Sequence, residues 1–219
     1  LPAENNDWRN VLIKHPVDIK FEITKGDARL ASGVPDDASS DFQGLLAGVG
    51  ALGSVLADLW SREGWGNWTY VDDDILKAHN IVRHSGKDCH IGLHKVNVVA
   101  DLVSLNYSNG LENPKRLIGK ISDPSRADIQ AAVTSAKLFV DATTTLNAPR
   151  DLASLDTTPR SASVFLTPSG KSSVLLLEDS ERKSRLDHLE AQYYRAILNS
   201  EWGDLHLEGH YGGLIVGGG

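Results

Sequence analysis

Three glycines, Gly48, Gly50 and Gly53, constrain the fold of this chain more than any other feature of its sequence. They stand in a G-x-G-x-x-G frame that follows the apolar run Leu45–Ala47 and precedes apolar residues at helical spacing. Glycine permits a tight turn and lets an anion approach the backbone, because it has no Cβ atom. The start of the following helix would offer unpaired N–H groups to a phosphate. The frame therefore predicts a nucleotide-binding turn, although a glycine turn that only packs closely is the alternative.

The flanking sequence extends this turn into an alternation of strands and helices. Leu52–Trp60 has helical spacing, Gly64 is placed to end that helix, and the β-prone run Trp68–Asp74 follows. Further helices are expected over Ile91–Leu105, Arg126–Ala136 and Arg185–Asn199, and further strands over Val17–Ile23, Lys137–Thr144 and, as a pair, within Ala162–Glu178. This order predicts an α/β, Rossmann-like, mostly parallel sheet with helices on both faces, plus a C-terminal antiparallel strand pair and helix.

Length and composition bound the domain organisation and the partners. The chain has 219 residues, and we expect residues 1–40 to be an N-terminal extension or the end of a preceding module, and 41–219 to form the nucleotide-binding domain. The chain holds no Met and stops in a glycine-rich segment, so we expect the C-terminal part of this domain to be incomplete. Its net charge of −7 argues against a nucleic-acid partner.

Targeting and cysteine signals are weak in this sequence. It has neither a membrane-spanning apolar run nor a signal-peptide pattern, so we expect a cytoplasmic protein with no membrane partner. Cys89 is the only cysteine, which excludes an internal disulfide and a multi-cysteine zinc site within the chain. We interpret it as an ordinary structural or surface cysteine.

Polar residues after the glycine frame favour ATP over NAD. Asp72 lies about 20 residues beyond the frame, where an acid can hydrogen-bond a ribose hydroxyl in either case. The following stretch adds Asp74, Asn80, Arg83 and, further on, Lys95. Arg binds phosphate oxygens with two parallel N–H groups and Lys acts as a point charge, so this set suits a triphosphate. A solvated charged surface is the alternative interpretation of the two cations.

Taken together, these motifs resemble the ThiF/MoeB/E1 superfamily of ATP-dependent activating enzymes. The superfamily patterns are G-x-G-x-L-G-S, D-x-D-x-V-x-x-S-N-L-x-R-Q and G-x-x-K-A. The chain has GVGALGS, DDDILKAHNIVRH and GLHKV at the same spacing, and the match covers residues 42–150. His79 and His84 replace the Ser and Gln of the pattern, which suggests a bacterial subgroup whose E1-like domain is joined to other ubiquitin-system modules.

The resemblance implies a function and a site. In this superfamily the C-terminal carboxylate of a ubiquitin-like or sulfur-carrier protein attacks the α-phosphate of ATP, which gives an acyl-adenylate and pyrophosphate. It implies ATP and Mg²⁺ as cofactors, a carrier protein or a peptide as partner, and a homodimer. Asn80, Arg83 and Lys95 would be catalytic, and Asp72 would bind the ribose. The implied nucleotide-binding residues are Gly48, Gly50, Ala51, Leu52, Gly53, Asp72, Asp74, Asn80, Arg83 and Lys95.

One departure from the superfamily pattern concerns the metal. The third strand usually ends in D-C-T-D-N, and its second acid approaches Mg²⁺. Here Asp141 matches the first acid, but Thr144 replaces the second. We expect Asp141 to bind Mg²⁺, with help from Asp74 or altered metal binding as alternatives, whereas a strand-end acid that caps the next helix would have no metal role. Two other functions stay open: an NAD(P)-dependent oxidoreductase and a catalytically degenerate E1-like binding scaffold.

Overall fold

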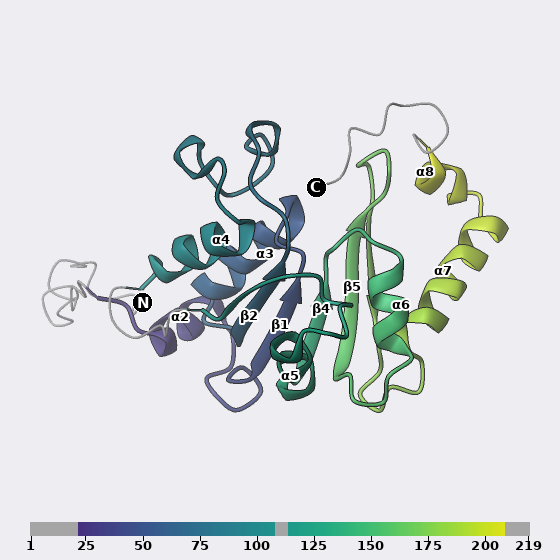
Figure 1. Ribbon diagram of the computed structural model, residues 1–219. Coiled ribbons are helices and arrows are strands. Elements are labelled where there is room, and N and C mark those ends of the chain that lie inside the picture. Colours follow the sequence, from purple (N-terminus) through teal and green to yellow (C-terminus); the bar gives the residue numbers. More distant parts are fainter. Residues whose placement is uncertain (1–21, 108–113, 209–219) are drawn as a thin grey trace, which may run out of the picture.

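A single six-stranded sheet organises the molecule, with helices on both faces (Figure 1). The computed structural model describes residues 22–107 and 114–208. The strands are β1 (Gln43–Ala47), β2 (Asn67–Asp72), β3 (Arg116–Ile118), β4 (Leu138–Asp141), β5 (Arg160–Leu166) and β6 (Ser173–Leu177), in the order β3-β2-β1-β4-β5-β6. Neighbours from β3 to β5 are parallel, and β6 is antiparallel to β5. The predicted fold class is confirmed.

The helices follow the expected order, with one error of extent. They are α2 (Lys25–Ser32), α3 (Ala51–Arg62), α4 (Lys95–Ser104), α5 (Ala127–Ser135), α6 (Asn147–Ala153), α7 (Leu186–Asn199) and α8 (Gly203–Leu207), with short 3₁₀ turns η1 (Ala78–Asn80) and η2 (Asp88–His90). The helix predicted over 91–105 begins only at residue 95. Gly92 has φ of +90°, and its N–H donates to the carbonyl of Leu76, so this segment is held out of a helix.

The core explains why the central strand is an apolar run. Leu46 belongs to the cluster beneath α3 and α4, whereas Leu45 and Ala47 belong to the cluster beneath α5 and α6. Successive strand residues point to opposite faces, so a strand covered by helices on both sides needs apolar residues throughout. The strand expected over 17–23 lies mostly outside the described residues, and Glu22 and Ile23 are not in a strand.

Part of the expected N-terminal extension is attached to the domain through Arg29 in α2. Its side chain is 7% exposed and donates hydrogen bonds to the carbonyls of Gly64 at 2.8 Å and Ser40 at 3.2 Å. It also forms an ion pair with Asp36 at 2.8 Å. These contacts fix α2 beside the end of α3. They attach part of the extension to the domain without defining where the domain begins, so the boundary at residue 40 stays a prediction.

Some expectations can be checked against the described ranges alone. Within residues 22–107 and 114–208, no helix is long and apolar enough to cross a membrane. The same ranges contain no group of three or more His, Cys, Asp or Glu residues that could hold a metal ion by themselves. Cys89 is exposed, as expected for a surface cysteine.

Candidate functional site

The candidate site lies at the carboxyl ends of the central parallel strands. The glycine turn follows β1, whose neighbours are β2 on one side and β4 on the other. Asp72 ends β2 and Asp141 ends β4, so the two carboxylates flank the turn. In open parallel sheets, ligands bind outside the carboxyl ends of the strands where the strand order reverses. The strand order of this sheet reverses at β1. The chain continues from β1 to β2 on one side, and β4 lies beside β1 on the other side.

The three glycines of the frame have different structural roles. Gly48 has φ of +82°, and a Cβ atom there would lie 2.6 Å from the backbone of Ala142. A Cβ atom at Gly53 would lie 1.9 Å from the carbonyl oxygen of Gly48. In contrast, a Cβ at Gly50 would meet no described atom within 4 Å. Gly48 and Gly53 are therefore required for packing, and Gly50 faces open space at the start of α3.

The start of α3 can accept an anion. Gly50 is the N-cap residue, and among the described residues no side chain caps the helix or places an acid in its first turn. Ala51 and Leu52 begin the helix. The first amides of a helix have no partners within the helix, and its dipole favours negative charge there. The glycine frame, Ala51 and Leu52 thus lie around one helix terminus, and their contact with phosphates stays a prediction.

Asp72 braces the glycine turn. Its Oδ2 accepts a hydrogen bond from the Val49 N–H and its Oδ1 accepts one from the Asp74 N–H, both at 2.8 Å. Burial raises the pKa of Asp72, and the two backbone donors and the charge of Lys95 oppose that shift. Each oxygen keeps acceptor capacity, because an ionised carboxylate offers about four lone-pair sites. The ribose contact therefore stays a prediction beside an observed structural role.

A largely buried ion pair, Lys95–Asp74, lies close to Asp72. The Lys95 side chain is 2% exposed, and its Nζ lies 2.7 Å from Oδ2 of Asp74. Burial tends to raise the pKa of Asp74, but the hydrogen bond and charge of Lys95 outweigh it, so that pKa lies below its ordinary value. Lys77 reaches the other oxygen of Asp74 at 3.7 Å from an exposed position. The site thus holds a desolvated cation whose partner is half-buried.

Asn80 and Arg83 differ in their surroundings. Asn80 is 2% exposed, and its Oδ1 accepts a hydrogen bond from the Lys77 N–H within the turn η1. Arg83 is exposed just after η1, and its N–H donates to the Asn80 carbonyl at 3.0 Å. Asn80 therefore has an evident role in shaping the turn that carries Arg83. The predicted phosphate contacts of both side chains stay predictions.

His84 is a site residue whose role the sequence reasoning missed. Its Nδ1 accepts the Gly86 N–H at 2.8 Å, so its Nε2 bears the proton and donates to the Val49 carbonyl at 2.8 Å. Burial lowers the pKa of His84, which keeps the ring neutral. Ser85 reinforces this junction through a 3.2 Å hydrogen bond from its N–H to the Ser54 hydroxyl. The only sequence signal was the replacement of Gln by His.

Asp141 lies on the other side of the glycine turn. It is 3% exposed, and its oxygens accept hydrogen bonds from the hydroxyls of Thr143 at 2.7 Å and Ser163 at 2.9 Å. Burial raises its pKa, and these hydrogen bonds oppose the shift. Thr144, at the position of the missing acid, is exposed and has φ of +60°. The described contacts hold Asp141 through hydroxyl groups and do not themselves test the predicted metal role.

The fold and this arrangement define a Rossmann-type α/β domain. A model described as "ThiF family" matches residues 36–155, which is more than half of the chain. The chain therefore belongs to the ThiF family, as its motifs predicted. No curated protein gives a significant sequence match.

Solved structures share the fold at low sequence identity. E. coli MccB with ATP is 15% identical with a TM-score of 0.50, over 59% of this chain and 39% of that protein. MccB with MccA-N7isoAsn is also 15% identical with a TM-score of 0.50, over 57% and 37%. PaaA is 16% identical with a TM-score of 0.51, over 74% of this chain and 55% of PaaA. The chain thus aligns with less than two fifths of MccB.

Proposed function

We propose that residues 41–219 belong to an ATP-dependent adenylation domain. It would transfer AMP to the C-terminal carboxylate of a ubiquitin-like protein, a sulfur-carrier protein or a peptide, with release of pyrophosphate. The attacking carboxylate is already a nucleophile, so the protein needs to position it and stabilise phosphate charge rather than remove a proton. This proposal rests on the family membership and on the residues around the glycine turn.

The buried Lys95 is the observation that carries this proposal. A lysine that is 2% exposed beside a phosphate-binding turn has no evident use in hydride transfer. Its Nζ is paired with Asp74, so a phosphate oxygen would have to share Lys95 with that carboxylate, in a low-dielectric environment where charges interact strongly. The start of α3 would bind other phosphate oxygens, Asp72 would bind the ribose, and Arg83 would approach from the exposed turn beyond η1. MccB, which shares the fold, has been crystallised with ATP.

Asp141 fits a Mg²⁺ site of limited protein contribution. Mg²⁺ prefers oxygen ligands and is often held by one or two carboxylates together with substrate phosphates and water. Asp141 supplies one carboxylate next to the glycine turn, and its hydrogen bonds from Thr143 and Ser163 fix its orientation. The ion would neutralise phosphate charge. Thr144 stands in place of the usual second acid, and this keeps the degenerate scaffold as the second candidate.

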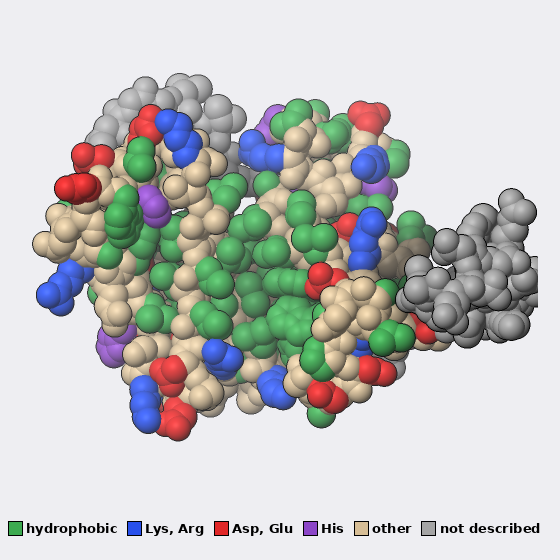
Figure 2. Space-filling view, turned by 180° about the vertical axis from the view of Figure 1, so that it is seen from behind, with side chains coloured by type: hydrophobic (Ala, Val, Ile, Leu, Met, Phe, Trp, Pro, Cys, Tyr) green, Lys and Arg blue, Asp and Glu red, His purple; other side chains and the backbone are tan. Residues whose placement is uncertain are grey.

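The partner and assembly are also part of this proposal. MccB has been crystallised with MccA, which supports a peptide or protein as the substrate of this chain. Leu175 and Leu177 on β6 are 64% and 45% exposed. Figure 2 shows hydrophobic side chains gathered across the middle of the molecule seen from behind. An apolar surface of this kind supports a homodimer. We also propose that the enzyme is cytoplasmic.

ATP–pyrophosphate exchange with candidate carboxylate partners tests the function. Lys95→Met should lower exchange by about 100-fold or more, because it removes a buried donor to charge in the transition state. Lys77→Met is the matched control, since Lys77 approaches the same Asp74 carboxylate from solvent, and it should stay within about threefold. Arg83→Ala should also abolish exchange.

Three other results would change the proposal. Exchange that survives both Lys95→Met and Arg83→Ala would refute the site. Binding of NADH without affinity for ATP would replace the proposal with the oxidoreductase. Thermal stabilisation by ATP without exchange for any partner would favour the scaffold.

A further inference from the structure

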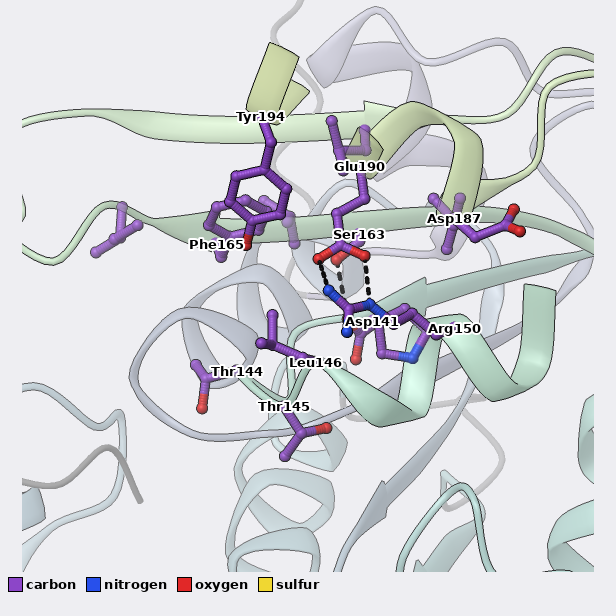
Figure 3. Close-up of a pocket in the computed structure, with 15 residues that line it drawn as sticks. Asp141, Thr144, Thr145, Leu146, Arg150, Ser163, Phe165, Asp187, Glu190 and Tyr194 are labelled. Carbon is purple, nitrogen blue, oxygen red and sulfur yellow. Dashed lines mark hydrogen bonds and ion pairs between the residues drawn. The ribbon is translucent and has the colours of Figure 1, made fainter. Parts of the chain in front are cut away.

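A cavity of about 160 Å³ lies between the carboxyl ends of β4 and β5 and the helices α6 and α7 (Figure 3). Its apolar lining comes from residues far apart in the sequence, namely Leu146, Pro149, Val164, Phe165, Leu166, Leu176, Leu186 and Tyr194. The rings of Phe165 and Tyr194 lie on one side of it, and the Arg150–Glu190 pair and Asp187 lie on the other. None of the residues proposed to bind phosphates or ribose lines it.

The cavity adjoins the place where adenylation would occur. Asp141, Thr144 and Thr145 form part of its wall. Asp141 pairs in the sheet with Ala47, the last residue of β1, and Gly48 follows it as the start of the glycine turn. A substrate side chain in the cavity would therefore belong to a polypeptide whose carboxylate approaches the α-phosphate from the side of β4.

The charges around the cavity disfavour an acidic group. Among the described residues that line the cavity, Arg150 is the only lysine or arginine, and its Nε and Nη2 each donate to Glu190 at 2.7 Å. Asp187 and Asp141 add carboxylates. An incoming carboxylate would have to displace Glu190 from Arg150, whereas an uncharged group would leave that ion pair intact.

The size of the cavity suits one apolar side chain. An engineered cavity of about 150 Å³ lined by Leu, Ile and Phe binds benzene in another protein. The cavity here has a similar volume, with an aliphatic and aromatic part of its lining beside a polar part. A leucine or phenylalanine side chain fits that description, and glycine would leave the space unfilled.

We propose that this cavity binds an apolar side chain of the substrate, carried by its last or second-last residue. The inference rests on the proposed function and narrows its substrate class. The preferred substrate is then a polypeptide whose terminus presents a branched aliphatic or aromatic side chain, in place of a terminus of two glycines.

Exchange measurements with matched peptides test the preference. Four peptides that differ only in their last two residues, which are Gly-Gly, Gly-Leu, Leu-Gly or Gly-Asp, are each assayed as a substrate of the full chain. One leucine peptide should exceed the Gly-Gly peptide by at least about tenfold in kcat/KM, because an apolar pocket discriminates by about 10- to 200-fold. The Gly-Asp peptide should gain nothing. Equal or higher kcat/KM for Gly-Gly would overturn the inference and leave adenylation intact.

A cavity-filling variant with a matched control ties the preference to this cavity. Leu176 lines the cavity, whereas Leu198 on α7 does not and is 81% exposed. Leu176→Trp should bring the ratio of kcat/KM between the leucine peptide and the Gly-Gly peptide down to about one, whereas Leu198→Trp should retain the preference. The smaller change Leu176→Phe serves if the tryptophan variant does not fold. A preference that survives in the folded Leu176 variant would overturn the inference.

Toluene, which mimics a phenylalanine side chain, tests the cavity without catalysis. It should shift the amide NMR signals of Phe165 and Leu186 in the wild-type chain and not in the Leu176 variant. No shift in the wild type would overturn the inference even if exchange is observed. Toluene binding together with no exchange for any peptide or carrier protein would instead refute the proposed function, and the substrate assignment with it.

Discussion

The two halves of the sheet hold their sites together in different ways. Around β1 and β2, the glycine turn is fixed by Asp72 and by close backbone packing, partly within the turn itself and partly against Ala142 after β4. Around β5 and β6, one buried carboxylate joins the elements that enclose the cavity. The nucleotide side of the site is therefore specified mainly by a short sequence motif. The cavity side depends on contacts between residues that are far apart in the chain.

Glu178 is that buried carboxylate. It is 0% exposed, and its Oε2 accepts hydrogen bonds from the Ser161 N–H at 3.0 Å and the Arg182 Nε at 2.8 Å. Its Oε1 accepts the N–H of Leu186 at 3.1 Å. One side chain thus connects β5, the turn after β6 and the start of α7, where Leu186 enters the cavity wall.

Removal of Glu178 should have the largest effect on stability. Glu178→Ala leaves the Arg182 guanidinium and two backbone N–H groups without this acceptor, so the free energy of unfolding should fall by about 3–5 kcal/mol. Urea denaturation measures the change. Glu181→Ala is the control, since Glu181 is exposed and pairs with Lys183 at the surface. Comparable losses for both variants would remove the contrast between the two halves.

A methyl group inside the glycine turn should have the next largest effect. Gly53→Ala places a Cβ atom 1.9 Å from the Gly48 carbonyl oxygen, so the turn must move and stability should fall by about 1–3 kcal/mol. Gly50→Ala, which meets no described atom within 4 Å, should cost less than about 1 kcal/mol. Thermal and urea unfolding of the pair would decide, and an equal response would show that the turn is looser than its contacts indicate.

The hydrogen bonds that Asp72 accepts should contribute less to the free energy of unfolding than the packing at Gly53 does. Asp72→Asn keeps the shape of the side chain but points an amide N–H at one of the two backbone donors, which should cost about 1–2 kcal/mol. The neighbouring Asp73→Asn changes an exposed residue and should be close to neutral. Urea midpoints measure both. An unchanged midpoint for Asp72→Asn would mean that the glycine turn holds without its brace.

The smallest effect concerns pH. Burial lowers the pKa of His84 below its ordinary 6.5 in the folded chain, so the unfolded chain binds more protons as pH falls through and below that value. Stability should therefore decrease as pH drops from about 7.5 to 5.5. His84→Gln should flatten this dependence, whereas exposed His188→Gln should not. Unfolding curves at each pH measure the slope, and an unchanged slope in His84→Gln would assign it to other groups.

The features that sequence analysis predicted well are those set by neighbouring residues. The glycine turn, the start of α3 and the positions of Asp72 and Asp141 follow from backbone sterics and from apolar periodicity, which act over a few residues. The start of α4 was misplaced because the hydrogen bond between Gly92 and Leu76 is not a local signal.

The features that could not be predicted arise from packing across the chain. Nothing in the spacing of His84 shows that its ring donates to the Val49 carbonyl. The role of Glu178 depends on the hairpin of β5 and β6 meeting α7, and an acid in a sequence is most often exposed. The cavity exists only once α6 and α7 cover the ends of β4 and β5, so no motif marks it.

The pairing of Lys95 with Asp74 has a consequence for the speed of nucleotide association. A cation that is already neutralised projects little positive field into solvent, and the chain as a whole carries a net charge of −7. Lys95 therefore adds little to the long-range attraction of an anion such as ATP, against the overall negative charge of the chain. Salt screens the overall repulsion over about 10 Å at 0.1 M, so added salt should speed association of ATP with this chain.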